Sequence, residues 1–276
     1  MKKVILITGA SSGIGLSAAK LLAAEGHIVY AAARRIERMK ELEPAGVRLI
    51  AMDVTDDASM IAGVKEITDR EHRIDVLVNN AGYGSYGALE DVPISEAKYQ
   101  FDVNIFGLAR LTQLVLPHMR AQHSGRIINI SSIGGRIGEP HGAWYHATKF
   151  AVEGLSDSLR MEVKEFGIDV IVIQPGAIKT EWTEIARQNM LKTSGHTAYS
   201  ELTQAHARMF ENADDQGSDP MVIAKVISKA INRRHPCTRY AAGMGAKPLL
   251  FLRSILSDKA FDRLVLFGIR TQGRQR

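Results

Sequence analysis

Residues 4–15 read VILITGASSGIG, a short apolar run that passes directly into glycines at positions 9, 13 and 15. Such a run ending at glycines is typical of a buried strand that feeds a tight turn. Residues 15–25 then carry apolar side chains at helical spacing, and a second apolar run follows at Ile28–Ala33. A strand, a turn, a helix and a strand in this order predict two parallel strands joined by a crossover helix.

The same alternation continues along the chain. Further apolar runs predict strands at Arg48–Met52, Val76–Asn79, Arg126–Ile130 and Asp169–Gln174. Helical patterns lie at roughly 36–43, 57–71, 95–121, 145–166 and 219–234. Strands that alternate with helices indicate an α/β fold, a doubly wound parallel sheet with helices on both faces. No linker or repeat divides residues 1–180, so we expect a single domain over residues 1–276.

The composition is that of an ordinary globular protein, with 45% hydrophobic and 24% charged residues among 276. Cys237 is the single cysteine, which excludes an internal disulfide and suits a reducing compartment. No Cys/His spacing indicates a metal site, and no apolar run reaches the roughly 18 residues of a membrane-spanning helix. The apolar start is too short for a signal peptide. We therefore expect a cytoplasmic protein without a metal.

The net charge of +5 is unevenly distributed. Residues 225–276 contain twelve Lys/Arg and two acids, which gives this part +10 and the remainder −5. Its last stretch, 248–268, has the pattern of an amphipathic helix, so residues 248–276 form a basic C-terminal extension. A basic segment can contact nucleic acid or anionic lipid. We favour a solvated helical surface and expect no nucleic-acid partner; peripheral membrane contact is the alternative.

The glycine turn predicts a dinucleotide site. Free backbone N–H groups and the positive end of the helix dipole meet there, and glycine allows a pyrophosphate to approach closely. The spacing G-x-x-x-G-x-G differs from the commoner G-x-G-x-x-G, and a plain tight turn is the alternative. The candidate contacts in this turn are Gly9, Ser11, Ser12, Gly13, Ile14 and Gly15.

The end of the second strand indicates which dinucleotide binds. NAD sites usually carry an acid there for the ribose hydroxyls, whereas this strand ends at Ala33 and continues into Arg34 and Arg35. Without a carboxylate a 2′-phosphate meets no repulsion, and a guanidinium can bind it bidentately. NADP(H) is therefore favoured. The alternative is that both arginines simply begin a solvated helix.

Two further strand ends contribute candidate cofactor contacts. Asp53, followed by Val54, closes the third strand and could accept from the adenine amino group; an N-terminal helix cap is the alternative. After Asn79, the fourth strand closes with Asn80, Ala81 and Gly82. Small residues there let a ribose approach, while an amide can tie neighbouring strands together.

Tyr145 and Lys149 are four residues apart and so share one face of a helix. This helix follows the strand that ends at Ser131-Ser132. With these residues the chain resembles the short-chain dehydrogenase/reductase family, in its single-domain branch and nearest its hydroxysteroid and retinol dehydrogenase-like members. The resemblance spans about residues 4–180. The matching positions are 8–15, Asp53, 79–82, Asn104, Ser132, Tyr145, Lys149, Pro175, Gly176 and Thr180.

The resemblance implies a Rossmann-type sheet of seven strands, the last near Arg239–Ala242. It also implies a homodimer or homotetramer in which the helices at roughly 98–121 and 145–166 pair. Apolar residues on these helices exceed what one sheet face should need. They are Phe101, Phe106, Leu114, Val115, Phe150, Leu155 and Leu159.

The implied chemistry interconverts a ketone or aldehyde with an alcohol, using NADP(H). Tyr145 transfers the proton, and the Lys149 ammonium with the oxidised nicotinamide lowers the tyrosine pKa from about 10. Lys149 also holds the nicotinamide ribose. Ser132, thirteen residues before the tyrosine, stabilises the substrate oxygen. Asn104 binds the water of a proton relay, or alternatively is a polar group satisfied within its helix.

The resemblance also assigns the loop after the sixth strand. Pro175 and Gly176 pass the nicotinamide, Ile178 lies beside its ring, and Thr180 reaches its amide or the phosphates. A simple strand-ending turn is the alternative.

The substrate side is less specific. The loop 133–144 and the segment 181–215 should wall the pocket, and their apolar members indicate a hydrophobic steroid-, retinoid- or lipid-like substrate. We expect 181–215 to be a mobile lid because its polar residues interrupt a rigid helix; a packed helical hairpin is the alternative. Other functions left open are reduction of a carrier-tethered acyl group and non-catalytic NADP(H) sensing.

Overall fold

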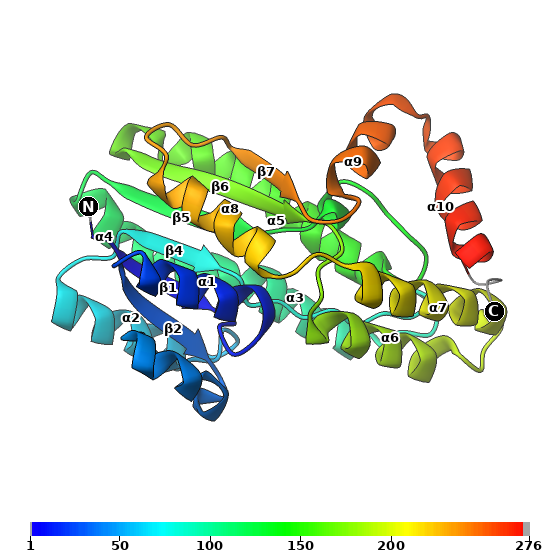
Figure 1. Cartoon of the computed structure of the whole chain (residues 1–276), viewed down its shortest axis with the longest axis horizontal. Helices are drawn as coiled ribbons and strands as arrows, with labels where there is room; N and C mark the ends of the chain where they lie inside the picture. The colour runs from blue at the N-terminus through cyan, green and yellow to red at the C-terminus, as the bar shows by residue number, and fades with distance from the viewer. Residues whose placement is uncertain (1, 273–276) are drawn as a thin grey trace.

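The computed structural model describes residues 2–272 and contains a seven-stranded sheet in the order β3-β2-β1-β4-β5-β6-β7 (Figure 1). Every neighbouring pair is parallel. The strands are β1 Val4–Thr8, β2 Ile28–Ala33, β3 Arg48–Ala51, β4 Val76–Asn79, β5 Gly125–Ile130, β6 Ile168–Pro175 and β7 Arg239–Ala242. The predicted Rossmann-type sheet is confirmed, including its seventh strand.

Helices cover both faces of this sheet. The helical elements of the described residues are α1 Gly13–Ala24, η1 Ile36–Ala45, α2 Asp57–Glu71, α3 Ile94–Phe101, η2 Asp102–Gly107, α4 Leu108–Ala121, η3 Ile133–Gly135, α5 Ala143–Glu162, η4 Lys164–Phe166, α6 Glu181–Ser194, α7 Ser200–Gln216, α8 Met221–Asn232, α9 Ala246–Ile255 and α10 Asp258–Gln272. One core contains buried side chains of α1 and α8, and the other those of α2, α4 and α5. Two apolar faces explain why the inner strands read as continuous apolar runs.

The helix predicted over 95–121 is three consecutive pieces. Between α3 and α4 the chain makes a π-helical segment, η2, that contains Asn104 and Gly107. The Asn104 side chain bonds to the backbone of Tyr83, and a Cβ on Gly107 would collide with Val54. These contacts to other parts of the chain set the local winding, and helical periodicity alone does not report them.

The segment 181–215 corrects the expectation of an interrupted lid. It forms two helices, α6 and α7, that lie side by side (Figure 1). Met190 is fully buried between them, while Gln188 bonds along the outer face to Glu184. The Ser194 hydroxyl also accepts from the backbone N–H of Ala88 at 2.8 Å. Gln188 thus lies on the outer face, whereas Ser194 is fully buried, and the packed helical hairpin is the observed form. Opening of this hairpin stays a prediction.

The basic C-terminal extension is two helices where the sequence predicts one. Helix α9 ends at Ile255, and α10, which contains the buried Phe261, packs against α7 (Figure 1). Among residues 2–272, no helix combines the length and apolarity needed to cross a membrane. Arg239 is not a free surface charge, because it pairs with Glu153 and Asp157.

Gly15→Ala should destabilise the fold. A Cβ on Gly15 would lie 2.5 Å from the carbonyl oxygen of Gly9 and 2.6 Å from the Asn80 amide nitrogen. We expect a loss of about 1–3 kcal/mol, the usual cost of overpacking. Gly154→Ala is the matched control, because nothing lies within 4 Å of its Cβ position in α5. Alanine should stabilise that exposed helical position by up to about 1 kcal/mol. Equal melting temperatures for both variants would contradict this.

Candidate active site

A pocket of about 710 Å³ lies at the carboxyl ends of the strands, where the strand order reverses between β1 and β4. Open α/β sheets bind their ligands at this crevice. Predicted site residues line it in one continuous wall: Gly9, Ser11, Ser12, Gly13, Ile14, Arg34, Arg35, Asp53, Val54, Asn80, Ala81, Gly82, Ser132, Tyr145, Lys149, Pro175, Gly176, Ile178 and Thr180. Gly15 and Asn104 are not in the wall; they lie behind it.

The glycine turn has the conformation that a phosphate cradle requires. Gly9 and Gly13 adopt φ values of +65° and +53°, which other residues rarely tolerate. Helix α1 begins at Gly13, so its free N–H groups face the pocket, and its first turn holds no acid. Thr180 lies against Gly13, which places it beside this helix end. These features fit a dinucleotide pyrophosphate.

The polar end of the pocket also fits the cofactor. Arg34 and Arg35 are both exposed and line the pocket beyond Ala33, and Arg34 donates to the Tyr99 hydroxyl at 3.0 Å. The Asp53 carboxylate accepts from the Thr55 backbone and hydroxyl through one oxygen only.

The alternative role for Asp53, a helix cap, is wrong. The residue before α2 is Asp56, and its side chain accepts from the backbone N–H of Ala58.

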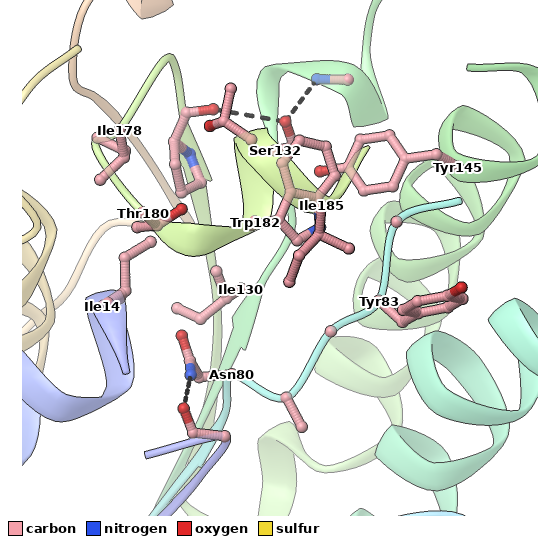
Figure 2. A pocket seen from close by; sticks show the side chains of 18 of the residues that line it. Ile14, Asn80, Tyr83, Ile130, Ser132, Tyr145, Ile178, Thr180, Trp182 and Ile185 are labelled. Carbon is pink, nitrogen blue, oxygen red and sulfur yellow. Dashed lines mark hydrogen bonds between the residues drawn. The ribbon is translucent and has the colours of Figure 1, made fainter. Parts of the chain in front are cut away.

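Ser132, two residues after the end of β5, lines the pocket together with Tyr145 and Lys149 of α5. Tyr145 projects from its helix toward Ser132 in Figure 2, with Trp182 beside it. The Ser132 hydroxyl accepts from the Gly134 backbone N–H at 3.0 Å, which fixes its position. Lys149 Nζ lies 5.8 Å from the centroid of the Tyr145 ring. The Ile130 carbonyl accepts from Nζ at 2.9 Å.

Burial shifts the pKa values of Tyr145 and Lys149 in opposite directions. It raises the pKa of Tyr145 to about 12, opposed by a hydrogen bond with Ser132 and assisted by the charge of Glu139. Burial likewise lowers the pKa of Lys149 to about 8. The expected lowering of the tyrosine pKa is therefore not produced by the residues of the chain itself. At neutral pH the phenol is protonated and suited to donating a proton.

The side-chain oxygen and nitrogen of Asn104 both form hydrogen bonds with neighbouring residues. Its amide oxygen accepts from the Tyr83 backbone N–H at 2.8 Å, and its amide nitrogen donates to the Tyr83 carbonyl and the Thr148 hydroxyl. Thr148 in turn donates to the Tyr145 carbonyl at 2.7 Å. The side chain thus joins η2 to the catalytic helix. Its partners lie outside its own helix, so the alternative of a polar group satisfied within that helix is wrong, and the relay role stays a prediction.

The comparisons with known proteins agree with this geometry. The family model of the short chain dehydrogenases matches residues 3–191. The chain belongs to the short-chain dehydrogenase/reductase family. It is 40% identical to a 3-ketodihydrosphingosine reductase of Bacteroides thetaiotaomicron, covering 87% of this chain and 88% of that one. It is 33% identical to estradiol 17-beta-dehydrogenase 1 of Rattus norvegicus, over 91% of this chain and 76% of that one.

Solved structures of this family share the fold. A short-chain dehydrogenase from Streptomyces avermitilis superimposes with a TM-score of 0.80 at 32% identity, covering 100% of this chain and 99% of that one. Serine dehydrogenase complexed with NADP+ gives 0.75 at 26% identity, over 87% and 94%. A family member from Burkholderia phymatum in complex with NAD gives 0.75 at 25%, over 86% and 88%. The family thus holds nicotinamide dinucleotides on this fold, and this chain is one of its oxidoreductases.

The structure adds pocket residues that the sequence did not single out. Tyr86 packs against Tyr145, with ring centroids 5.6 Å apart, and also against Trp182 and Phe210. Glu139 and His146 line the same part of the pocket. Glu139 belongs to the loop expected to wall the substrate site, so its position was predictable. Tyr86 carries no sequence signal, because its burial depends on the α6–α7 hairpin.

Proposed function

We propose that this chain is an NADP(H)-dependent oxidoreductase that reduces a ketone or aldehyde to the alcohol, with the reverse reaction at the same site. The observation that carries this is the convergence of Ser132, Tyr145 and Lys149 on the pocket that the glycine turn opens. When bound, the nicotinamide supplies or accepts the hydride. An intact set of this kind argues against a purely cofactor-sensing role.

The side chains then have distinct tasks. The Tyr145 phenol donates its proton to the substrate oxygen, and the Ser132 hydroxyl stabilises the charge that develops there. The Lys149 ammonium favours the resulting phenolate. Because burial raises the pKa of Tyr145 to about 12, the proton donor is available throughout the neutral range.

NADP(H) is the proposed cofactor because the pocket carries Arg34 and Arg35 beyond β2 and has no acid at that strand end. A hydrophobic substrate is proposed because aromatic and aliphatic side chains surround Tyr145, among them Trp182, Met209 and Phe210. The named activities of the bacterial and rat relatives support a lipid- or steroid-like carbonyl compound.

A homodimer or homotetramer is also proposed. Fewer apolar residues are exposed for its subunit interface than the sequence indicates. Phe106 and Phe150 are 61% and 50% exposed on η2 and α5 and can form a contact. Val115 and Leu159 lie in the core instead, because both face the sheet.

Cys237 is an exposed free thiol, which supports a cytoplasmic location. Peripheral membrane contact of the basic extension stays a prediction.

Tyr145→Phe should remove turnover and leave cofactor binding. Loss of a positioned proton donor commonly costs about 10²–10⁴-fold in rate. We expect kcat for NADPH-dependent reduction of a hydrophobic ketone to fall in that range, while the NADPH Kd from fluorescence titration changes little. Tyr199→Phe is the control, because Tyr199 is exposed and bonds only outside the pocket. Near-normal turnover of Tyr145→Phe would refute the mechanism.

Arg34→Ala should weaken NADPH more than NADH. A charged contact to the 2′-phosphate contributes enough that its loss should raise the NADPH KM by about 10- to 100-fold. The KM for NADH should stay within a few-fold of its original value. Lys40→Ala removes an equal charge from η1 outside the pocket wall and should change neither value. Equal effects of Arg34→Ala on both cofactors would contradict the proposed 2′-phosphate contact.

Reduction should slow as the pH rises through about 8, because burial lowers the pKa of Lys149 to about 8 from its usual 10.5. The ammonium is present below that pH and is lost above it. The profile of kcat/KM for NADPH reports groups of the free enzyme and should show this fall. A profile that stays flat to the ordinary lysine pKa would show that Lys149 keeps its charge.

A further inference from the structure

Helices α9 and α10 leave four large apolar side chains exposed to solvent. Phe251 and Ile255 of α9 are 62% and 60% exposed, and Leu264 and Phe267 of α10 are 38% and 67% exposed. Both helices lie at one edge of the molecule, outside the sheet and the helices that cover it (Figure 1). Large apolar residues that are exposed as neighbours on a helix commonly mark a surface that binds a partner.

Two cations flank the exposed aromatic residue of α10. Arg263, Phe267 and Arg270 follow one another at spacings of four and three residues, so they share one side of the helix. All three are exposed, and Leu264 lies three residues before Phe267. The buried Phe261 lies on the other side of the helix. The solvent side of α10 is therefore both apolar and basic.

The two acids of α10 lie away from this side. Asp262 precedes Arg263 directly, so its side chain is about 100° around the helix from that arginine. Asp258 pairs with Arg253 of α9 at 2.7 Å, at the connection between the two helices. Neither acid thus compensates the pair of arginines beside Phe267.

Helix α9 has a similar arrangement. Lys247, Phe251 and Ile255 are spaced four residues apart and are all exposed, so a cation stands at the end of an apolar row. Leu249 lies on the opposite side of this helix from Phe251 and lines the pocket. A single helix thus separates the substrate pocket from an exposed apolar row.

The charges favour a lipid surface over a second copy of the chain as the partner. A two-fold contact uses the same surface on both subunits, so it would bring Arg263 and Arg270 of one copy toward those of the other. Like charges brought together in this way oppose association. Anionic lipid headgroups attract Lys and Arg instead, and the boundary of the acyl chains accepts the apolar residues between them.

We propose that the exposed sides of α9 and α10 dock the protein on an anionic lipid membrane. The lysine and arginines contact the headgroups, while Phe251, Ile255 and Phe267 enter the boundary between headgroups and acyl chains. Because α9 borders the pocket, docking brings the substrate site close to the bilayer in which the proposed lipid-like substrate dissolves.

Vesicle binding tests the apolar part of this contact. The protein should bind phosphatidylcholine vesicles with about one-third phosphatidylglycerol at least about tenfold more tightly than vesicles of phosphatidylcholine alone. Phe267→Ser and Ile255→Ser should each lower the affinity for the mixed vesicles by about 10- to 100-fold, the usual effect of burying such a side chain. Ile94→Ser is the matched control for Ile255→Ser, because Ile94 is 59% exposed on α3, and it should leave the affinity unchanged.

A charge-neutralising pair tests the electrostatic part. Arg263→Gln combined with Arg270→Gln should lower the affinity for the mixed vesicles by about 10- to 30-fold, because each cation near an anionic surface contributes about fivefold. Lys225→Gln combined with Lys229→Gln removes the same charge from exposed positions of α8 and should retain most of the binding. Added salt should weaken the binding of wild type.

The outcomes distinguish the membrane from a second copy of the chain. Equal binding to both vesicle types, or an unchanged affinity in Phe267→Ser, would overturn membrane docking. Wild type that ignores vesicles but loses an oligomeric state in Phe267→Ser would also overturn it, and would assign this surface to a subunit contact. Binding is measured without turnover, so failure of the proposed carbonyl reduction would leave the docking standing.

Discussion

The site depends on the joint between β1 and β4, the two strands between which the sheet reverses its order. The Thr8 hydroxyl accepts from the backbone N–H groups of Asn80 and Ala81, at 3.1 and 3.0 Å. The Asn80 amide donates back to the carbonyls of Thr8 and Gly9. These bonds hold the glycine turn against the end of β4. A backbone fixed in this way can present its N–H groups without rearrangement when a phosphate arrives.

The catalytic residues at this edge of the sheet are buried, and their burial removes the solvation that stabilises their charged forms. Lys149 and Tyr145 are both buried, and burial disfavours the charged form of each. Both shifts oppose the ammonium–phenolate pair that would follow proton donation. The positive charge that the oxidised nicotinamide brings would favour that pair. The residues of the chain therefore keep the Tyr145 phenol protonated. Stabilisation of its phenolate would come from the oxidised nicotinamide in the product complex.

The sheet and most of the cofactor wall were predictable, whereas the substrate end was not. Buried parallel strands read as apolar runs, and the glycine turn fixes where the first one ends. The π-helical segment depends on Asn104 bonding to Tyr83, 21 residues earlier. The α6–α7 hairpin depends on a bond between Ser194 and Ala88, 106 residues apart. The periodicity of one segment does not predict contacts with distant segments. The aromatic residues around Tyr145 are therefore known only from the structure.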